Sequence, residues 1–469
     1  MDYKGKKIVV MGLGRYRDGS GIAAALYFAK SGAKEVLITD LKTEEDLKSQ
    51  VSRLKKFKNV KFVLGKHREE DFKDADVVFQ NPSVPDSSPY LKMARKRGIP
   101  VINDWSIFLE SGERFLIGIT GTRGKSTTAA LVYEMVKLSA GKRKVFLCGN
   151  IGVSPLRYMD KIGDSDIVVA ELSSWLLRGF REAKRSPDIG VLTNLLVDHQ
   201  DKYGSLKEYY KDKDNIFLFQ NKDDFLVASR DNAEARKRAL RAPSKIFWFS
   251  IKYPSSGNGG YVKNGKIYFR NGNENELIAS VSDVKLKGTA NLQNAVAAVT
   301  AARIFGVAPR DIKTALKSFR GLPGRMEFVG SYKGISFYND TTSTTPDAGL
   351  AALRALSDKK RKIVLIAGGQ DKKLDFKEFS REVKKSVKSL VLFKGTASEK
   401  IKKGLGKTVV IEASSMREAV ESALNTAAKG DIVLLSPAAA SFGMFKNEYD
   451  RGDQFNREVK KQYGGVRLK

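Results

Sequence analysis

The sequence has few of the residues that crosslink a chain or gather around metals. It contains one cysteine, Cys148, and two histidines, His67 and His199, among 469 residues. A single cysteine excludes an internal disulfide, which fits a reducing compartment and favours a cytoplasmic location. Apolar runs of roughly 18 residues or more are absent, and the run near the N-terminus is too short for a signal peptide. We therefore expect no membrane-spanning helix and no membrane partner.

Acidic residues are too few to balance the basic ones. The chain has 84 Lys and Arg against 53 Asp and Glu, which gives a formal net charge of +31. One interpretation is a P-loop ATPase that binds nucleic acid, and the other is a lysine-rich solvated surface that also attracts anionic substrates. The lysines are spread along the chain, with no basic tail and no interleaved aromatic motif. We favour the second interpretation and expect no nucleic-acid partner.

Length and patterning indicate about three α/β domains. Short apolar runs alternate with helical segments along the chain, which is typical of parallel sheets. We expect a Rossmann-like domain at residues 1–106 and a central P-loop domain at 107–322, with added hairpins at 240–285. A Rossmann-like C-terminal domain is expected at 323–469. The segment FRGLPGR, residues 319–325, combines Gly and Pro and predicts a hinge.

The strongest motif is GITGTRGKS at residues 118–126. A predicted strand, residues 115–120, delivers the chain to a glycine turn from which a helix leaves, so backbone N–H groups point at a phosphate. Lys125 can reach the β- and γ-phosphates of a nucleotide, and the Ser126 hydroxyl can bind Mg²⁺. Ile119 stands where the Walker pattern requires glycine, which makes the loop a variant. The alternative, a plain glycine turn, does not account for the strand, turn and helix in this order.

The loop GITGTRGKST resembles the ATP loop of the Mur ligases, which usually has Asn at the position of Arg123. Folylpolyglutamate synthases carry a related loop. The resemblance implies an ATP-dependent ligase. It assigns nucleotide contacts to Gly121, Thr122, Gly124, Lys125, Ser126 and Thr127.

Two further motifs resemble the metal site of the same family. The strand DIVVA places Glu171 at its carboxyl end, the edge at which open α/β sheets bind ligands. The segment AELSS resembles the family motif whose Glu serves the metal, and DHQD places His199 in the family's second metal motif. The resemblance implies two Mg²⁺ ions. Without it, a lone Glu at a strand end and a lone His after a strand are ordinary structural residues.

The helix predicted after residue 205 carries a lysine on its inward face. That face comprises Leu206, Tyr210, Lys213, Phe217 and Gln220. Burial lowers the pKa of a lysine, and a neutral amine can add CO₂ to form a metal-binding carbamate. Mur ligases carry a carbamylated lysine four residues after a tyrosine, as Lys213 follows Tyr209 here. The alternative is a lysine that reaches solvent from the helix edge between Asp212 and Asp214.

Matches in the second half of the chain imply further nucleotide contacts. GTANLQNAVAA resembles the family helix that faces adenine, which points to Asn291 and Asn294, although Ala290 replaces the usual histidine. Such amides could equally be helix caps. LPGRMEF and FYNDTTSTT imply that Arg325 binds phosphate and that Asp340 lies near the ribose. A guanidinium suits phosphate through two parallel hydrogen bonds.

The first domain invites a dinucleotide-binding interpretation, but its spacing opposes it. The pattern that begins at Gly12 and Gly14 requires glycine at position 17, where Arg17 stands. In the D-glutamate-adding branch of the family this domain binds UDP. The resemblance therefore assigns the UDP-linked substrate to Gly14, Arg15, Asp40, Lys42 and, from the CGNIGVSPL motif, Asn150.

The same branch of the family implies the identity of the incoming amino acid. The resemblance assigns it to Thr344, Lys372 and Ser441, although Thr342 stands where the branch has a lysine. We therefore expect a monomeric enzyme that adds D-glutamate to UDP-MurNAc-L-alanine through an acyl phosphate. An L-alanine-adding ligase and a folylpolyglutamate synthase remain alternatives.

Overall fold

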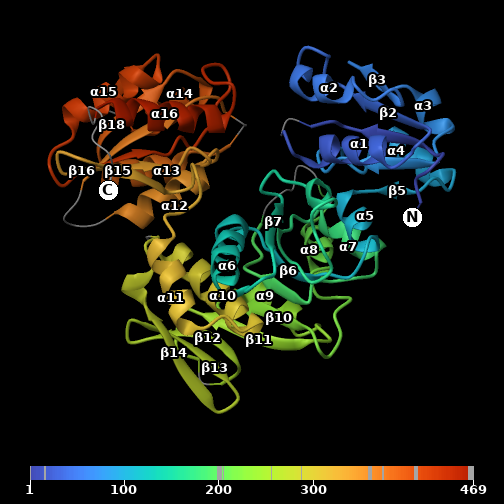
Figure 1. Ribbon diagram of the computed structural model, residues 1–469. Coiled ribbons are helices and arrows are strands. Elements are labelled where there is room, and N and C mark those ends of the chain that lie inside the picture. The colour runs from blue at the N-terminus through green and yellow to red at the C-terminus, as the bar shows by residue number, and fades with distance from the viewer. Residues whose placement is uncertain are drawn as a thin grey trace. The chain divides into compact units, whose positions relative to one another are not determined.

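The computed structural model forms two compact units, each described by itself below. The described residues are 2–14, 17–197, 203, 205–254, 256–286, 288–357, 362–371, 374–405 and 410–462. The first unit comprises Met1–Asp283 and Gln293–Lys317, and the second comprises Val284–Leu292 and Ser318–Lys469. Figure 1 follows the chain through them from blue to red. The main break, at Ser318, falls one residue before the predicted hinge. Within the described part, no helix is both long and apolar enough to cross a membrane.

The first unit begins with a five-stranded parallel sheet in the order β3-β2-β1-β4-β5. Its strands are β1 (Lys7–Met11), β2 (Glu35–Asp40), β3 (Val60–Leu64), β4 (Val77–Gln80) and β5 (Val101–Ile102). Its helices are α1 (Ser20–Lys30), α2 (Lys48–Leu54), α3 (Glu69–Lys73), α4 (Pro89–Lys96) and α5 (Asp104–Glu110). Ile8 and Val10 pack in the core formed with α1 and α2, whereas Val9 and Met11 pack in the core with α3 and α4. Alternate residues of β1 thus bury both faces, which explains its continuous apolar run.

The same unit contains a nine-stranded sheet in the order β14-β13-β12-β11-β10-β9-β6-β8-β7. Its strands are β6 (Phe115–Thr120), β7 (Val145–Gly149), β8 (Ile167–Glu171), β9 (Ile189–Leu192), β10 (Phe225–Ser229), β11 (Lys245–Ser250), β12 (Gly259–Lys263), β13 (Lys266–Asn271) and β14 (Glu274–Ser280). Its helices are α6 (Lys125–Ser139), η1 (Pro155–Tyr158), α7 (Leu177–Glu182), α8 (Leu206–Asp214), α9 (Ala233–Ala239), η2 (Val281–Asp283), α10 (Thr289–Phe305), of which the first four residues belong to the second unit, and α11 (Pro309–Ser318).

One part of the hairpin prediction is wrong. Strands β12, β13 and β14 form antiparallel hairpins as predicted, but β11 (KIFWFS) pairs in parallel with β10 and β12. A parallel pair needs a crossover, and α9 supplies it between β10 and β11. Helix α9 was not predicted.

The second unit has a six-stranded sheet in the order β15-β16-β20-β17-β18-β19, in which only β15 is antiparallel. Its strands are β15 (Glu327–Tyr332), β16 (Ile335–Asn339), β17 (Ile363–Gly368), β18 (Val387–Phe393), β19 (Val410–Ala413) and β20 (Ile432–Leu435). One core packs α12 (Pro346–Leu356), α13 (Lys377–Ser386) and α14 (Thr396–Leu405) on one face. A second core packs α15 (Met416–Thr426) and α16 (Glu448–Gln462) on the other face. The predicted α/β architecture is confirmed, while β15 was not predicted.

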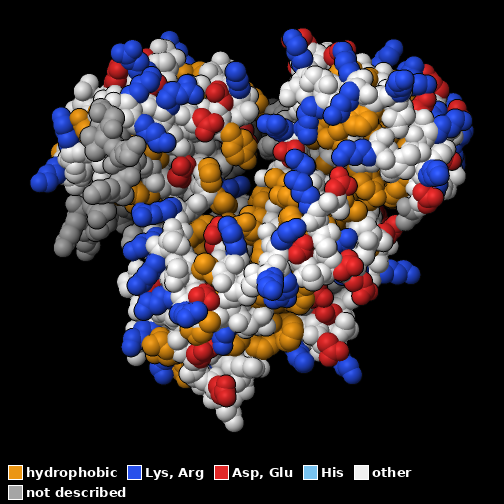
Figure 2. Space-filling model, viewed as in Figure 1, with side chains coloured by type: hydrophobic (Ala, Val, Ile, Leu, Met, Phe, Trp, Pro, Cys, Tyr) orange, Lys and Arg blue, Asp and Glu red, His pale blue; other side chains and the backbone are white. Residues whose placement is uncertain are grey.

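Basic side chains are scattered over the visible face rather than gathered in one patch. Figure 2 shows lysine and arginine side chains interspersed with acidic and apolar ones. This distribution agrees with a solvated basic surface.

Candidate functional site

The glycine turn after β6 is built by close approach of other segments. Gly124 has φ +83°, and a Cβ there would lie 2.1 Å from Oδ1 of Asn294. Gly121 has φ +147°, and a Cβ there would lie 1.9 Å from Oγ1 of Thr193. Only glycine fits both the backbone angles and the available space. Helix α6 begins at Lys125, and its N-cap residue, Gly124, has no side chain that could cap the helix. The N–H groups of the first turn of a helix are the usual partners of an anion such as a phosphate.

Two residues that the sequence analysis missed hold this turn in place. Thr193 Oγ1 donates to the carbonyl of Arg123 at 2.7 Å, and Asn194 Nδ2 donates to the same oxygen at 3.1 Å. Asn194 Oδ1 accepts from the Arg123 N–H at 2.9 Å. The Arg123 side chain itself is exposed, so replacing the usual Asn leaves the cradle intact. Thr193 and Asn194 directly follow the apolar strand β9, and a polar pair at the end of a buried strand is the sequence feature that could have identified them.

The P-loop lysine already lies over the turn. Lys125 Nζ donates to the carbonyls of Gly121 and Thr122 at 3.1 and 3.0 Å. Ser126 is buried on the first turn of α6. Both side chains thus lie beside the uncapped helix end, as the sequence predicts.

A buried carboxylate lies on the neighbouring strand. Glu171 ends β8, is 1% exposed and pairs in register with Ile119 of β6. Its Oε1 accepts from Nδ2 of Asn150 at 3.2 Å, and its Oε2 is buried without a hydrogen-bond partner among the described residues. A buried carboxylate oxygen without a partner is costly, and a cation would satisfy it. The residue therefore fits a Mg²⁺ ligand, while Asn150, predicted for the UDP-linked substrate, holds its other oxygen.

Lys213 points inward from α8 to the same turn. It is 2% exposed, and its Nζ donates to the Gly121 carbonyl at 2.8 Å and to Thr120 Oγ1 at 3.5 Å. Its ammonium group lies 4.8 Å from the centre of the Tyr209 ring. The Thr120 hydroxyl donates to the carbonyl of Leu172, next to Glu171, at 2.7 Å. The predicted inward orientation is confirmed, and these contacts join the lysine, the turn and the acidic strand end.

The alternative, a lysine that reaches solvent, is wrong because Lys213 is itself buried. Its acidic neighbours Asp212 and Asp214 are buried as well. Asp212 pairs with Arg178 at 2.7 Å, and Asp214 pairs with Arg238 at 2.5 Å. The predicted helix is also too long. Helix α8 ends at Asp214, so the buried Phe217 and Gln220 lie in the following turns rather than on its face. Gln220 leaves the helix pattern because its amide donates to the carbonyls of Pro187 and Phe225, both at 2.8 Å.

Three predicted site residues, Arg15, His199 and Lys372, lie outside the described residues. Within the described part, no three His, Cys, Asp or Glu side chains converge as a metal site. Of the predicted metal ligands, Ser126 and Glu171 are described and offer oxygen donors, which suit Mg²⁺.

In the first sheet, Asp40 acts as a support for two loops. It is 8% exposed; its Oδ2 accepts from the Leu13 N–H at 2.8 Å and its Oδ1 from the Lys42 N–H at 3.0 Å. A Cβ on Gly21 would lie 2.2 Å from the Gly12 carbonyl, so α1 packs closely on the glycine loop. This loop lies between β1 and α1, at the point where the strand order reverses, the usual ligand crevice of such sheets.

Asp104 links this loop to the one that carries Asn150. It is fully buried; its Oδ2 accepts from Ser20 Oγ at 2.6 Å and from Ser154 Oγ at 2.8 Å. The Ser154 N–H also donates to the Asp18 carbonyl at 2.9 Å. Ser20 is the first residue of α1. Burial raises the pKa of Asp104. Asp104 was not predicted as a site residue, because its partners come from segments that only the tertiary structure brings together.

In the second unit, the predicted ribose ligand Asp340 is turned inward. It is 5% exposed and accepts hydrogen bonds from the Ser343 hydroxyl, from Ser436 Oγ at 2.9 Å and from the Met326 N–H at 3.1 Å. Arg325, by contrast, is exposed. Asp340 therefore fastens β16 to the end of β20 and to the turn that follows the predicted hinge.

Three loops of this unit that carry predicted amino-acid contacts are tied to one another. The Ala440 and Gln370 backbones exchange two hydrogen bonds of 3.0 Å, which connects the loop after β17 to the loop after β20. Asp340 connects the loop after β16 to Ser436. Thr344 is half-buried and Ser441 is buried at the ends of these loops.

The burial of Asp340 predicts a pH effect on stability. Burial raises its pKa from 3.8 to about 6, so between these values the folded protein binds more protons than the unfolded chain. Stability therefore falls as pH rises through this window, by up to about 3 kcal/mol, and is level above it. Asp340→Asn is expected to unfold at higher urea than the wild type at pH 7.5 but not near pH 4. A gain independent of pH would contradict this, and the exposed Asp347→Asn is the control.

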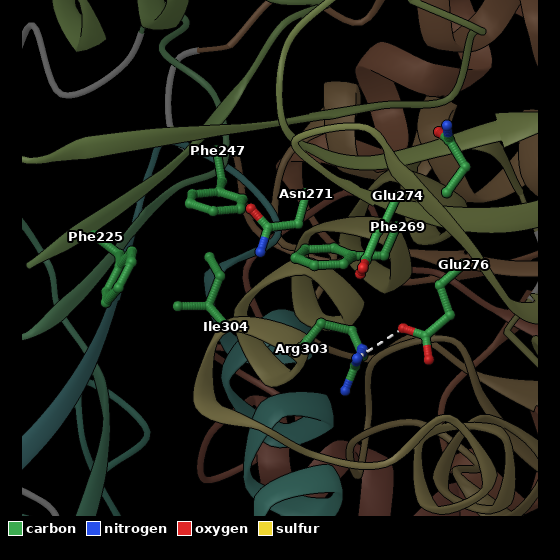
Figure 3. Close-up of a pocket in the computed structure, with 9 residues that line it drawn as sticks. Phe225, Phe247, Phe269, Asn271, Glu274, Glu276, Arg303 and Ile304 are labelled. Atoms are coloured by element: carbon green, nitrogen blue, oxygen red, sulfur yellow. Dashed lines mark ion pairs between the residues drawn. The ribbon is translucent and has the colours of Figure 1, made fainter.

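A separate pocket of about 520 Å³ lies on the outer part of the nine-stranded sheet. Figure 3 shows the rings of Phe225, Phe247 and Phe269 along the pocket, with Arg303 next to Phe269 and paired with Glu276 at 2.7 Å. None of the predicted site residues lines it.

Family models match three parts of the chain: the MurD-like N-terminal domain of Mur ligases at residues 6–103, the Mur ligase middle domain at 119–302, and the glutamate ligase domain of Mur ligases at 324–439.

Relatives match over nearly the whole chain. The UDP-N-acetylmuramoylalanine–D-glutamate ligase of Roseiflexus sp. (strain RS-1) is 38% identical over 98% of this chain and 99% of its own. That of Borreliella afzelii (strain PKo) is 37% identical over 98% of both chains. The structure of UDP-N-acetylmuramate-alanine ligase from Thermotoga maritima covers 97% of this chain and 100% of its own, with a TM-score of 0.60 at 19% identity, and supports the fold. The chain therefore belongs to the Mur ligase family.

Proposed function

We propose that this protein is the ATP-dependent ligase that adds D-glutamate to UDP-MurNAc-L-alanine during peptidoglycan precursor synthesis. The observation that carries the proposal is the P-loop turn. The buried Lys213 donates a hydrogen bond to its Gly121 carbonyl, and the buried Glu171 ends the neighbouring strand. Relatives that carry this activity in their names align over the full chain at up to 38% identity. Because both the nucleotide and the UDP-linked precursor belong to the cytoplasm, we place the enzyme there, as a monomer.

The reaction has two steps. The terminal carboxylate of UDP-MurNAc-L-alanine attacks the γ-phosphorus of ATP, which releases ADP and forms an acyl phosphate. The amine of D-glutamate then attacks the acyl carbon, the C–O bond to phosphate and one N–H bond break, and an amide, inorganic phosphate and a proton remain. Lys125 and the N–H groups of the α6 end stabilise negative charge on the transferred phosphoryl group.

Ligases of this family use ATP and Mg²⁺. We assign two ions to Ser126, Glu171, His199 and a carbamylated Lys213. The inward position of Lys213, with its Nζ 2.8 Å from the Gly121 carbonyl, supports the assignment. Bound Mg²⁺ would neutralise charge on the phosphoryl oxygens.

The remaining predicted contacts complete the substrate sites. Nucleotide contacts are assigned to Gly121, Thr122, Gly124, Thr127, Asn291, Asn294, Arg325 and Asp340. The UDP-linked substrate is assigned to Gly14, Arg15, Asp40, Lys42 and Asn150. The amino acid is assigned to Thr344, Lys372 and Ser441. The inward bonds of Asp40 and Asp340 support a role for both in holding the loops that contact the ligand.

An acceptor screen tests the proposed function. Phosphate release from ATP and amide formation are measured with UDP-MurNAc-L-alanine plus D-Glu, L-Glu or L-Ala, and with UDP-MurNAc plus L-Ala. We expect product only with UDP-MurNAc-L-alanine and D-Glu. Turnover of UDP-MurNAc with L-Ala would instead identify the L-alanine-adding reaction. ATPase activity stimulated by DNA and not by the UDP-linked substrate would favour the nucleic-acid ATPase.

A further inference from the structure

Helix α16 carries a fully buried arginine whose hydrogen bonds all go to neutral groups. Arg451 is 0% exposed. Its Nη2 donates to the Thr341 carbonyl at 2.8 Å, its Nε to Thr341 Oγ1 at 3.1 Å and its Nη1 to the Ala439 carbonyl at 3.3 Å. Within the described part of the chain, these are the hydrogen bonds of its side chain, and it forms no ion pair with a carboxylate. A buried cation with only neutral partners is costly, which calls for an explanation.

The two residues that Arg451 holds lie in loops assigned to the incoming amino acid. Thr341 lies three residues before Thr344, and Ala439 lies two residues before Ser441. The guanidinium therefore spans the end of β16 and the loop after β20. Because Ala440 of the same loop exchanges backbone hydrogen bonds with Gln370, all three amino-acid loops are joined to this one side chain.

The helix is seated so that this cation cannot move away from the loops. The Gly452 carbonyl accepts from Asn339 Nδ2 at 3.1 Å, and a Cβ on Gly452 would lie 2.6 Å from Cγ2 of Thr341. Next to the arginine's acceptor, Ala438 has φ +57°, which is costly for alanine. The bonds of Arg451 help to hold this strained loop in place.

Burial lowers the pKa of Arg451 to about 10, and the nearby Glu448 opposes this shift. The guanidinium therefore remains charged at neutral pH. Since water is excluded around it, its field acts at low dielectric and is screened little by salt.

We propose that Arg451 is a positioning and specificity-determining residue that sets the three amino-acid loops and supplies a buried positive charge selecting an acidic amino acid. The inference rests on the proposed function, because it assumes that the amino acid binds at these loops. With the reacting amine neutral, D-glutamate carries two negative charges, one more than its side-chain amide analogue, so a buried positive charge favours the acidic amino acid. The residue acts through the loops and the field, without touching the reacting atoms.

The test compares D-Glu with D-Gln, whose side chain is neutral, in the full-length enzyme. In Arg451→Met and Arg451→Gln, we expect the ratio of kcat/KM for D-Glu to that for D-Gln to fall about tenfold or more, as expected when a low-dielectric charge is lost. The KM for UDP-MurNAc-L-alanine should stay within about twofold of wild type, because Arg451 bonds to loops assigned to the amino acid and not to residues assigned to the UDP-linked substrate. Arg451→Lys retains the positive charge but loses the planar set of N–H donors of the guanidinium. It should therefore keep the preference for D-Glu over D-Gln while kcat falls.

Three outcomes overturn the inference: a neutral variant that keeps the wild-type preference, an Arg451→Lys variant that loses as much as Arg451→Met, or a loss that affects both amino acids equally. Variants are compared only if their thermal unfolding is cooperative. A measurement on the wild type needs no variant: the preference should persist in about 0.5 M KCl, since buried charges are screened little. If the preference for D-Glu were lost in salt, exposed lysines would be responsible for it instead of Arg451. Failure of the wild type to ligate D-Glu would reject the proposed function itself.

Discussion

Replacing Lys213 with alanine is expected to reduce kcat roughly 10²–10³-fold, the range associated with losing several kcal/mol of transition-state stabilisation. The side chain is 2% exposed and donates to the Gly121 carbonyl, so its loss leaves a hole beside the phosphate loop. The substitution also removes the group to which CO₂ would add. Because the amine of Lys213 bonds to the phosphate turn, the KM for UDP-MurNAc-L-alanine should change less than kcat.

The carbamate makes this prediction specific. If a carboxylate-like group acts at this position, small acids such as acetate or formate should partly restore the activity of Lys213→Ala, in proportion to their concentration. Ammonium or methylamine should not. Steady-state phosphate release with a titration of each additive measures the effect. Rescue by amines and not by acids would show that Lys213 acts as an ammonium and would reject the carbamate.

Lys211 provides the matched control for this experiment. It lies on the same helix α8, two residues away, and is exposed. Lys211→Ala should retain nearly wild-type kcat and show no response to acetate. A comparable loss in Lys211→Ala would indicate that disturbance of α8, rather than the inward amine, accounts for the effect.

Gly124→Ala is expected to raise the KM for ATP or lower kcat by roughly 10²-fold, because small displacements of a positioned phosphate cradle have effects of this size. The new Cβ would lie 2.1 Å from Asn294 Oδ1, and the backbone angle φ of +83° is unfavourable for alanine. The turn must therefore shift, or α10 must move its amide. Equilibrium nucleotide binding and steady-state kinetics together distinguish lost affinity from lost rate.

Gly141 separates backbone strain from the steric conflict. It has φ +63° just after α6, and a Cβ there would meet no atom within 4 Å. Gly141→Ala therefore carries a similar angular penalty, of about 1–2 kcal/mol in stability, without touching the site. If Gly124→Ala were no worse in nucleotide binding than Gly141→Ala, the packing of Asn294 against the turn would not determine the shape of the cradle.

Local patterns predicted much of the site because the chemistry of a phosphate loop depends on residues that are adjacent in the sequence. The turn at 121–124, the helix behind it and the strand ending at Glu171 follow from apolar runs and glycine spacing. The inward position of Lys213 followed from its place among large side chains. The same periodicity misjudged the helix end at Asp214, since the buried Gln220 amide is satisfied by carbonyls of other segments.

The sequence by itself determined the α/β class, the order of the elements, the phosphate loop and the family. Each of these depends on short stretches whose local periodicity and spacing are sufficient. Only the tertiary structure decided which distant groups meet: Asn194 on Arg123, Asp104 between two serines, and Arg451 behind the loops of the third sheet. These contacts depend on burial and on hydrogen bonds between segments up to 110 residues apart, which no local pattern records.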